Sequence, residues 1–173
     1  ALALDTQKQH GNMGLAFTYN EPLMNYEYVR DCAGLLKEAG LKTVLVTNGE
    51  LSAGPFRKLL PLIDAMNIDL KSFSEKVYAE ILQGNLKETM DFIERAASEC
   101  HMEITTLVVP GINDREEEIR EMTEWIAGLN NGRGEEIPYH LSRFFPRYNM
   151  TDRKMTDAHV IYSLADIARE RLK

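Results

Sequence analysis

The stretch GLAFTYNEPLMNYEYV, residues 14–29, changes from strand to helix within a few residues. Residues 15–17 form a short apolar run typical of a buried strand. Pro22 suits the first turn of a helix, where a backbone N–H has no intrahelical partner in any case. Apolar residues then recur every three or four positions until Gly40, which is typical of an amphipathic helix and its end. The junction between strand and helix is polar and consists of Thr18, Tyr19, Asn20 and Glu21.

The same change from strand to helix is repeated along the chain. Apolar or β-branched runs predict further strands at 43–49, 64–72, 103–113 and 137–144. Helical patterns predict helices near 56–60, 74–82, 87–99, after 114 and after 156. The expected N-terminal caps are Ser52, a capping box of Asp114 and Glu117, and Thr156. Strands that alternate with helices pair in parallel, so the sequence predicts an α/β fold with about five parallel strands.

Polar residues stand at the end of every predicted strand. In parallel α/β folds the ligand site lies at the C-terminal ends of the strands, so these residues are expected to meet on one rim. We expect the acidic helix surface of residues 114–125 to face solvent instead. The rim groups are Thr18–Glu21, Thr47–Gly49, Asp69–Lys71, Pro110–Asn113 and His140–Arg143.

Asp69 and Lys71 are two residues apart on a strand, so their side chains share one face. Asp69 is expected to meet Glu21 and Asn20 of the first strand exit and Thr47 and Asn48 of the second. Together these residues suit the ammonium, carboxylate and hydroxyl groups of a small zwitterionic ligand. Each also has a purely structural interpretation. Asp69 and Lys71 could form a buried ion pair, Glu21 could complement a helix dipole, Thr47–Gly49 could be a turn, and His140 could be a core histidine.

The composition and charge of the chain argue against several classes of function. The chain of 173 residues has a net charge of −7 and no basic stripe, so it gives no electrostatic support for nucleic-acid binding. It contains no apolar run long enough for a membrane span and no signal peptide, which predicts a cytoplasmic protein. Cys32 and Cys100 are the only cysteines and cannot by themselves hold zinc or an iron–sulfur cluster, so we assign no metal ligands.

The N-terminus resembles the last part of a helix. Residues 1–13 carry closely spaced Ala and Leu and a C-capping Gly11, without a preceding cap or strand. We therefore interpret 1–173 as a single domain, the C-terminal part of a longer barrel, in which 1–13 is the tail of a preceding helix.

Five ordered motifs between Gly14 and Met150 resemble those of the radical S-adenosylmethionine (SAM) enzymes, specifically the pyruvate formate-lyase activating enzyme type. TYNEP stands where those enzymes have Ser-Gly-Gly-Glu-Pro, and TNG, DLK, VVPG and PYH match their later strands. The spellings AFTYNEP, VLVTNG, DAMNIDLKSFS and SRFFP resemble the AmmeMemoRadiSam-system branch. The resemblance implies a partial (β/α)6 TIM-like barrel with SAM across its open top.

The resemblance also implies roles for individual residues. Asn20 and Glu21, next to Tyr19, would receive the methionyl amino group. Asp69 and Lys71 would contact the ribose and the carboxylate. The other implied cofactor-binding residues are Thr47 and Asn48, beside that pair, and His140, at the adenosine.

Reductive cleavage of SAM in this family uses a [4Fe–4S] cluster bound by a Cys-x3-Cys-x2-Cys motif. This chain lacks that motif, and we expect it upstream of Ala1, so that the 173 residues alone would be inactive. Val46 stands where activating enzymes usually carry Asp, and HLSRFFP replaces their His-Glu-Leu-Gly continuation. Arg143 and Arg147 are therefore candidates for binding an anionic group of another substrate.

No catalytic residue can be assigned from these motifs. A protein substrate and a flavodoxin- or ferredoxin-like reductant are the candidate partners besides SAM. Two alternatives remain: a barrel lyase with a Schiff base at Lys71, and a non-catalytic SAM-binding domain.

Overall fold

The computed structural model describes residues 2–173, which contain one five-stranded sheet. All neighbouring strands are parallel, and their spatial order follows the sequence order. The α/β fold prediction is therefore confirmed. The strands are β1 (Gly14–Phe17), β2 (Lys42–Thr47), β3 (Ala65–Asp69), β4 (His101–Val108) and β5 (Tyr139–Arg143).

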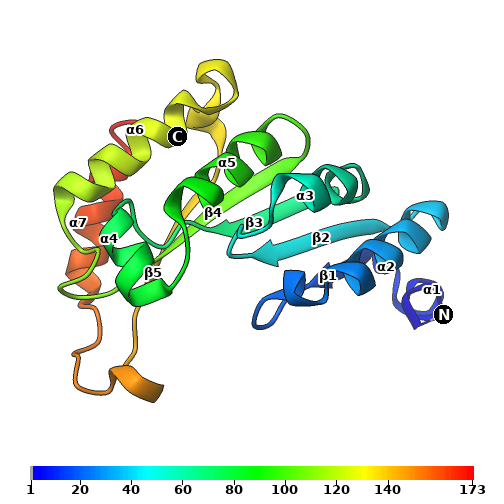
Figure 1. Cartoon of the computed structure of the whole chain (residues 1–173), viewed down its shortest axis with the longest axis horizontal. Coiled ribbons are helices and arrows are strands. Elements are labelled where there is room, and N and C mark those ends of the chain that lie inside the picture. Colours follow the sequence, from blue (N-terminus) through cyan, green and yellow to red (C-terminus); the bar gives the residue numbers. More distant parts are fainter. Residues whose placement is uncertain (1) are drawn as a thin grey trace.

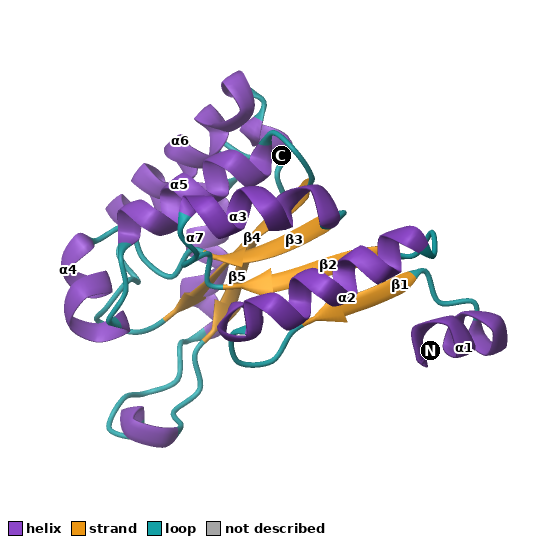
Figure 2. Ribbon diagram, turned by 45° about the vertical axis from the view of Figure 1, so that its right-hand side comes forward, coloured by secondary structure: helices purple, strands orange, loops and turns teal. Residues whose placement is uncertain are grey.

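Helices follow the strands as the hydrophobic periodicity predicts. Figure 1 shows the alternation along the chain, and in Figure 2 helices α2, α3 and α5 lie over the same face of the sheet. The α-helices are α1 (Leu2–His10), α2 (Tyr26–Glu38), α3 (Ala53–Leu59), α4 (Glu75–Val77), α5 (Leu86–Ala97), α6 (Glu116–Gly132) and α7 (Ala158–Ala168). Within residues 2–173, none of these helices has the length and apolar character needed to cross a membrane.

The two faces of the sheet differ because strand side chains alternate in direction. In β3, Met66 and Ile68 are buried beneath the helices, whereas Asn67 and Asp69 are partly exposed on the opposite side. We call this opposite side the open face. The strand pairing aligns its residues across the sheet, and Asp69 pairs with Thr105 of β4. Polar side chains thus gather on the face that the helices leave uncovered.

Strand β1 lies at one edge of the sheet and pairs with β2 alone among the described strands. Gly14 allows this pairing, because a Cβ atom there would stand 1.8 Å from the carbonyl oxygen of Lys42. An apolar groove of about 610 Å³ lies beside this edge. It is lined by Leu2 and Leu15 together with Cys32, Leu35 and Leu36 of α2 and the following Leu41.

Two of the three predicted capping side chains, Asp114 and Thr156, make other contacts instead. The Asp114 carboxylate accepts the N–H of Gly111, and α6 begins after Arg115 without a side-chain cap. Asp157, not Thr156, caps α7. Ser52 does occupy the residue before α3, but its hydroxyl makes no capping bond.

Candidate functional site

An ion pair marks the C-terminal end of β3. The Nζ atom of Lys71 lies 2.9 Å from an Asp69 carboxylate oxygen, and 35% and 37% of the two side chains are exposed. Leu70, between them, is fully buried on the other face. The prediction that Asp69 and Lys71 share one face is therefore correct, and the pair lies on the surface rather than in the core. Both charged groups remain accessible to a ligand.

Glu21, at the end of β1, is tied to the protein itself. Its Oε1 accepts the Thr47 hydroxyl at 2.7 Å and the Leu23 N–H at 3.0 Å, and its Oε2 accepts the Asn48 N–H at 2.7 Å. The bond from Leu23 also caps the short 3-10 helix Pro22–Asn25, which stands where the sequence predicts the first turn of α2. One lone pair of Oε2 remains, because each carboxylate oxygen accepts about two bonds.

The backbone just before Glu21 takes an unusual path. Tyr19 and Asn20 have positive φ values of 69° and 50°. Asn tolerates this left-handed region better than most residues, whereas an aromatic residue there is uncommon. Tyr19 is 89% exposed, and Asn20 is exposed as well. The strand exit thus presents an aromatic ring and an amide to solvent beside Glu21.

Thr47 and Asn48 fit the turn interpretation. Thr47 is buried, and its hydroxyl accepts the Gly49 N–H while it donates to Glu21. The Asn48 side chain accepts the N–H of Glu50 two residues on, as in an Asx turn. These two residues therefore connect the ends of β1 and β2, and their side-chain oxygens are largely engaged.

His140 does not lie in the core. Its Nε2 is 2.8 Å from Glu103 on the open face, and His101 lies 3.4 Å from the same carboxylate. The hydrogen bond from His140 is the main cause that lowers the pKa of Glu103 below its ordinary value. The strand register aligns His140 with Thr105, and Thr105 with Asp69. His140 and Asp69 therefore lie at the same height along the strands. Glu103 is not among the predicted site residues, although it lies two residues before Thr105 in β4 and therefore on the same face.

The two arginines proposed for substrate binding lie apart from this face. Arg143 lies three residues after His140 in β5, so the two side chains point to opposite faces of the sheet. Its guanidinium donates to the Thr156 carbonyl at 2.9 Å. The alternation of side chains thus directs Arg143 away from the open face. Arg147 is exposed in the loop after β5, which projects beyond the sheet in Figures 1 and 2.

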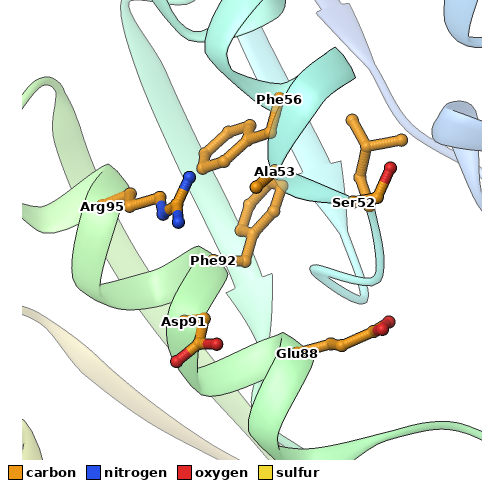
Figure 3. A pocket seen from close by; sticks show the side chains of 8 residues that line it. Ser52, Ala53, Phe56, Glu88, Asp91, Phe92 and Arg95 are labelled. Carbon is orange, nitrogen blue, oxygen red and sulfur yellow. The ribbon is translucent and has the colours of Figure 1, made fainter.

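A separate pocket of about 200 Å³ lies between α3 and α5 on the helix-covered side (Figure 3). Phe56 and Phe92 stack there with ring centroids 3.7 Å apart. Glu88, Asp91 and Arg95 complete its polar side. None of the predicted site residues lines this pocket, so the rim and the pocket are different features.

The model of the radical SAM superfamily matches residues 4–125, which include the ends of β1, β2, β3 and β4. This chain belongs to the radical SAM superfamily. The predicted resemblance is thereby confirmed at the level of the superfamily.

The curated relatives of this chain include activating enzymes. An uncharacterized protein of Methanocaldococcus jannaschii, MJ0808, is 32% identical over 91% of this chain and 46% of its own length. The pyruvate formate-lyase 1-activating enzyme of Escherichia coli K12 is 26% identical over 73% of this chain and 53% of its own length. This chain thus spans about half the length of these relatives.

A solved structure shows the same fold. It is a domain of pyruvate-formate lyase-activating enzyme from Bacteroides vulgatus, with a TM-score of 0.74 and 19% identity. The match covers 91% of this chain and 94% of that domain.

The rim residues of this radical SAM chain fit SAM by their chemistry. Lys71 offers an ammonium group for a carboxylate, Asp69 offers acceptors for hydroxyl or ammonium groups, and Asn20 offers an exposed amide. Its cysteines do not fit a [4Fe–4S] cluster. Cys32 lies in α2 and Cys100 precedes β4, at the opposite end of the strands. Burial raises the pKa of the Cys100 thiol to about 11, and residues 2–173 contain no metal-binding group of three His, Cys, Asp or Glu side chains.

Proposed function

We propose that this chain is the SAM-binding part of a radical SAM enzyme similar to the activating enzymes. The observation that carries the proposal is the accessible Asp69–Lys71 pair at the C-terminal end of β3, in a chain that belongs to this superfamily. The five strands present one open face, and the pair lies at its rim.

Each end of SAM has a candidate partner. The Lys71 ammonium binds the carboxylate, and the Asp69 carboxylate accepts a ribose hydroxyl; charge-assisted bonds of this kind are stronger than neutral ones. The remaining lone pair of Glu21 Oε2, together with the exposed Asn20 amide, receives the methionyl amino group. His140 contacts the adenosine from the same face, where its bond to Glu103 orients the imidazole. Thr47 and Asn48 act indirectly, because they fix the position of Glu21.

When bound, SAM supplies a sulfonium carbon–sulfur bond for reductive cleavage, and this chain's residues orient the molecule for it. Cleavage needs a [4Fe–4S] cluster, whose cysteines must come from outside these 173 residues. We therefore expect this chain alone to bind SAM weakly and not to cleave it. The substrate of the whole enzyme, whether a protein or a small molecule, and its flavodoxin- or ferredoxin-like reductant would engage the same rim.

Calorimetric titration with SAM and with S-adenosylhomocysteine tests the assignment. Asp69→Ala and Lys71→Ala should each weaken binding by roughly 1–3 kcal/mol, the value of a lost charged hydrogen bond. Lys42→Ala is the matched control, because Lys42 forms a similar 2.7 Å pair with Asp64 near the N-terminal ends of the strands. It should leave the affinity unchanged.

Unchanged affinity in both rim variants would contradict the assignment. Borohydride reduction tests the lyase alternative. If Lys71 formed a Schiff base, borohydride added with a carbonyl compound such as pyruvate would leave a covalent adduct on Lys71. We expect no such adduct, because Lys71 is paired and about one third exposed rather than desolvated like an activated Schiff-base lysine.

A further inference from the structure

The segment of residues 70–74 follows β3 and carries Lys71, and its carbonyl groups are bound by side chains from distant positions. The hydroxyl of Thr106 donates to the carbonyl of Leu70 at 2.6 Å. The side-chain amide of Asn113 donates to the carbonyl of Lys71, also at 2.6 Å. Loop carbonyls usually face water, so this internal bonding restricts the backbone on both sides of Lys71.

Glu118 of α6 binds the next two residues of the same segment. One carboxylate oxygen accepts both the Ser72 hydroxyl and the Phe73 N–H, the latter at 2.9 Å. The Ser72 hydroxyl in turn accepts the Ser74 N–H. We call the side chains of Thr106, Asn113 and Glu118 the exit clamp.

The exit clamp is buried although it is polar. Glu118 is only 3% exposed, Asn113 is 2% exposed, and Thr106 is fully buried. The second oxygen of Glu118 is buried without a hydrogen-bond partner among residues 2–173, and the guanidinium of Arg115 lies 3.6 Å from it. A buried carboxylate with an unsatisfied oxygen reduces stability. The hydrogen bonds that this carboxylate accepts come from the segment that carries Lys71.

The chain also carries a reporter next to the exit clamp. Trp125, its one tryptophan, lies in α6, and its ring packs on Phe73 with centroids 5.8 Å apart. Phe73 is two residues from Lys71, and its N–H is bound to Glu118. A displacement of the segment after β3 must therefore change the surroundings of the indole.

We propose that Asn113 and Glu118 are positioning residues, which hold the backbone of residues 71–73 so that the Lys71 ammonium stays beside Asp69 on the open face. Ligand contact at Lys71 is then reported by Trp125 through Phe73. The inference rests on the proposed function only for the identity of the ligand. The hydrogen bonds that define the exit clamp do not depend on it.

Trp125 fluorescence during SAM titration gives the first test. In the wild-type chain, Trp125 emission should change on SAM addition, reach half of its full change at the calorimetric midpoint and saturate at higher SAM concentrations. Glu118→Ala should raise the dissociation constant at least about tenfold, and Glu118→Gln, which keeps an acceptor for the Phe73 N–H, should recover most of that loss. Thr123→Val is the matched control, because its buried hydroxyl bonds the Ile119 carbonyl within α6. Equal affinities of Glu118→Ala and Thr123→Val would overturn the proposal.

Amide hydrogen exchange without ligand gives the second test. Glu118→Ala should speed exchange of the Phe73 amide at least about tenfold, and Thr123→Val should not. Unchanged exchange in Glu118→Ala would overturn the positioning role. If calorimetry detects no SAM binding while Glu118→Ala accelerates exchange, the proposed function fails and the positioning role of Glu118 is supported. Flat Trp125 fluorescence in a chain that binds SAM by calorimetry would overturn the link between Lys71 and Trp125.

Discussion

Two strand exits carry a carboxylate on the same rim, but the two carboxylates are used in different ways. Glu21 after β1 accepts three hydrogen bonds from Leu23, Thr47 and Asn48. Asp69 at the end of β3 pairs with the neighbouring Lys71 and with no other residue of 2–173, and more than a third of its side chain is exposed. The Glu21 carboxylate links the ends of β1 and β2. The Asp69 carboxylate instead remains partly exposed beside Lys71, whose backbone is held by other residues.

This difference shows that the position of an acidic residue at a strand end does not define its role. Its oxygens must be counted against the donors around them, since an oxygen already occupied by internal donors has little left for a ligand. By that count, Asp69 and Lys71 can exchange their mutual bond for bonds to a ligand. Glu21 can add only one bond.

The largest expected effect is on stability at β1. Glu21→Ala leaves the Thr47 hydroxyl and two backbone N–H groups without their acceptor, so we expect the free energy of unfolding to fall by roughly 2–4 kcal/mol. Urea denaturation measures this loss. Glu121→Ala, at an exposed position of α6, is the control and should change the free energy by less than about 0.5 kcal/mol. A cost below about 1 kcal/mol for Glu21→Ala would show that its carboxylate is free for other partners.

A smaller effect is expected at β3. A double-mutant cycle of Asp69→Ala and Lys71→Ala should give a coupling energy of about 0.2–1 kcal/mol in unfolding, because both side chains are partly exposed. Alanine also keeps the backbone bonds of residue 71 to Tyr78 and Asn113. A coupling above about 2 kcal/mol would make the pair a structural ion pair after all.

The sequence predicts those parts of the site that depend on local spacing. The two-residue period of a strand places Asp69 and Lys71 on one face, and the alternation of strands and helices gives the parallel sheet. The missed features depend on partners far along the chain. Glu103 binds His140, which lies 37 residues later, and Thr156 binds the Val108 carbonyl across 48 residues.

The acidic run at the start of α6 shows the same limit. Its composition predicts a solvated surface, and Glu116 and Glu117 are indeed exposed. Glu118 is buried, because its side of α6 faces the segment after β3 and its carboxylate accepts the Phe73 N–H. Three adjacent glutamates have equal charge, and only the tertiary fold separates their roles.

A third prediction concerns Glu103 on the open face. Its pKa is lowered, mainly by the hydrogen bond from His140. A depressed carboxyl pKa stabilises the fold above the unfolded value of about 4.3, and this contribution is lost as the pH falls through the folded value. His140→Ala should therefore raise the pKa of Glu103. The loss of unfolding free energy that His140→Ala causes should shrink as the pH falls below about 4.

Carboxyl carbon chemical shifts followed by NMR measure the Glu103 pKa directly, and His10→Ala, in the exposed α1, is the control. An unchanged Glu103 titration in His140→Ala would mean that the pair does not persist in solution. The His140 imidazole would then be available to a ligand without first breaking a bond to Glu103.

The smallest effect extends the comparison to the N-terminal ends of the strands, where Cys100 precedes β4. Burial raises the pKa of its thiol to about 11, so the thiolate needed to attack a disulfide reagent or bind iron is scarce at neutral pH. In a Cys32→Ser variant, the reaction with Ellman's reagent should be slow at pH 8, and its rate should rise toward pH 11. Wild-type chain supplied with iron and sulfide without oxygen should stay colourless, since the two cysteines lie in different elements and cannot supply three cluster ligands. A fast reaction of Cys100 at neutral pH, or a brown product, would contradict this account of its thiols.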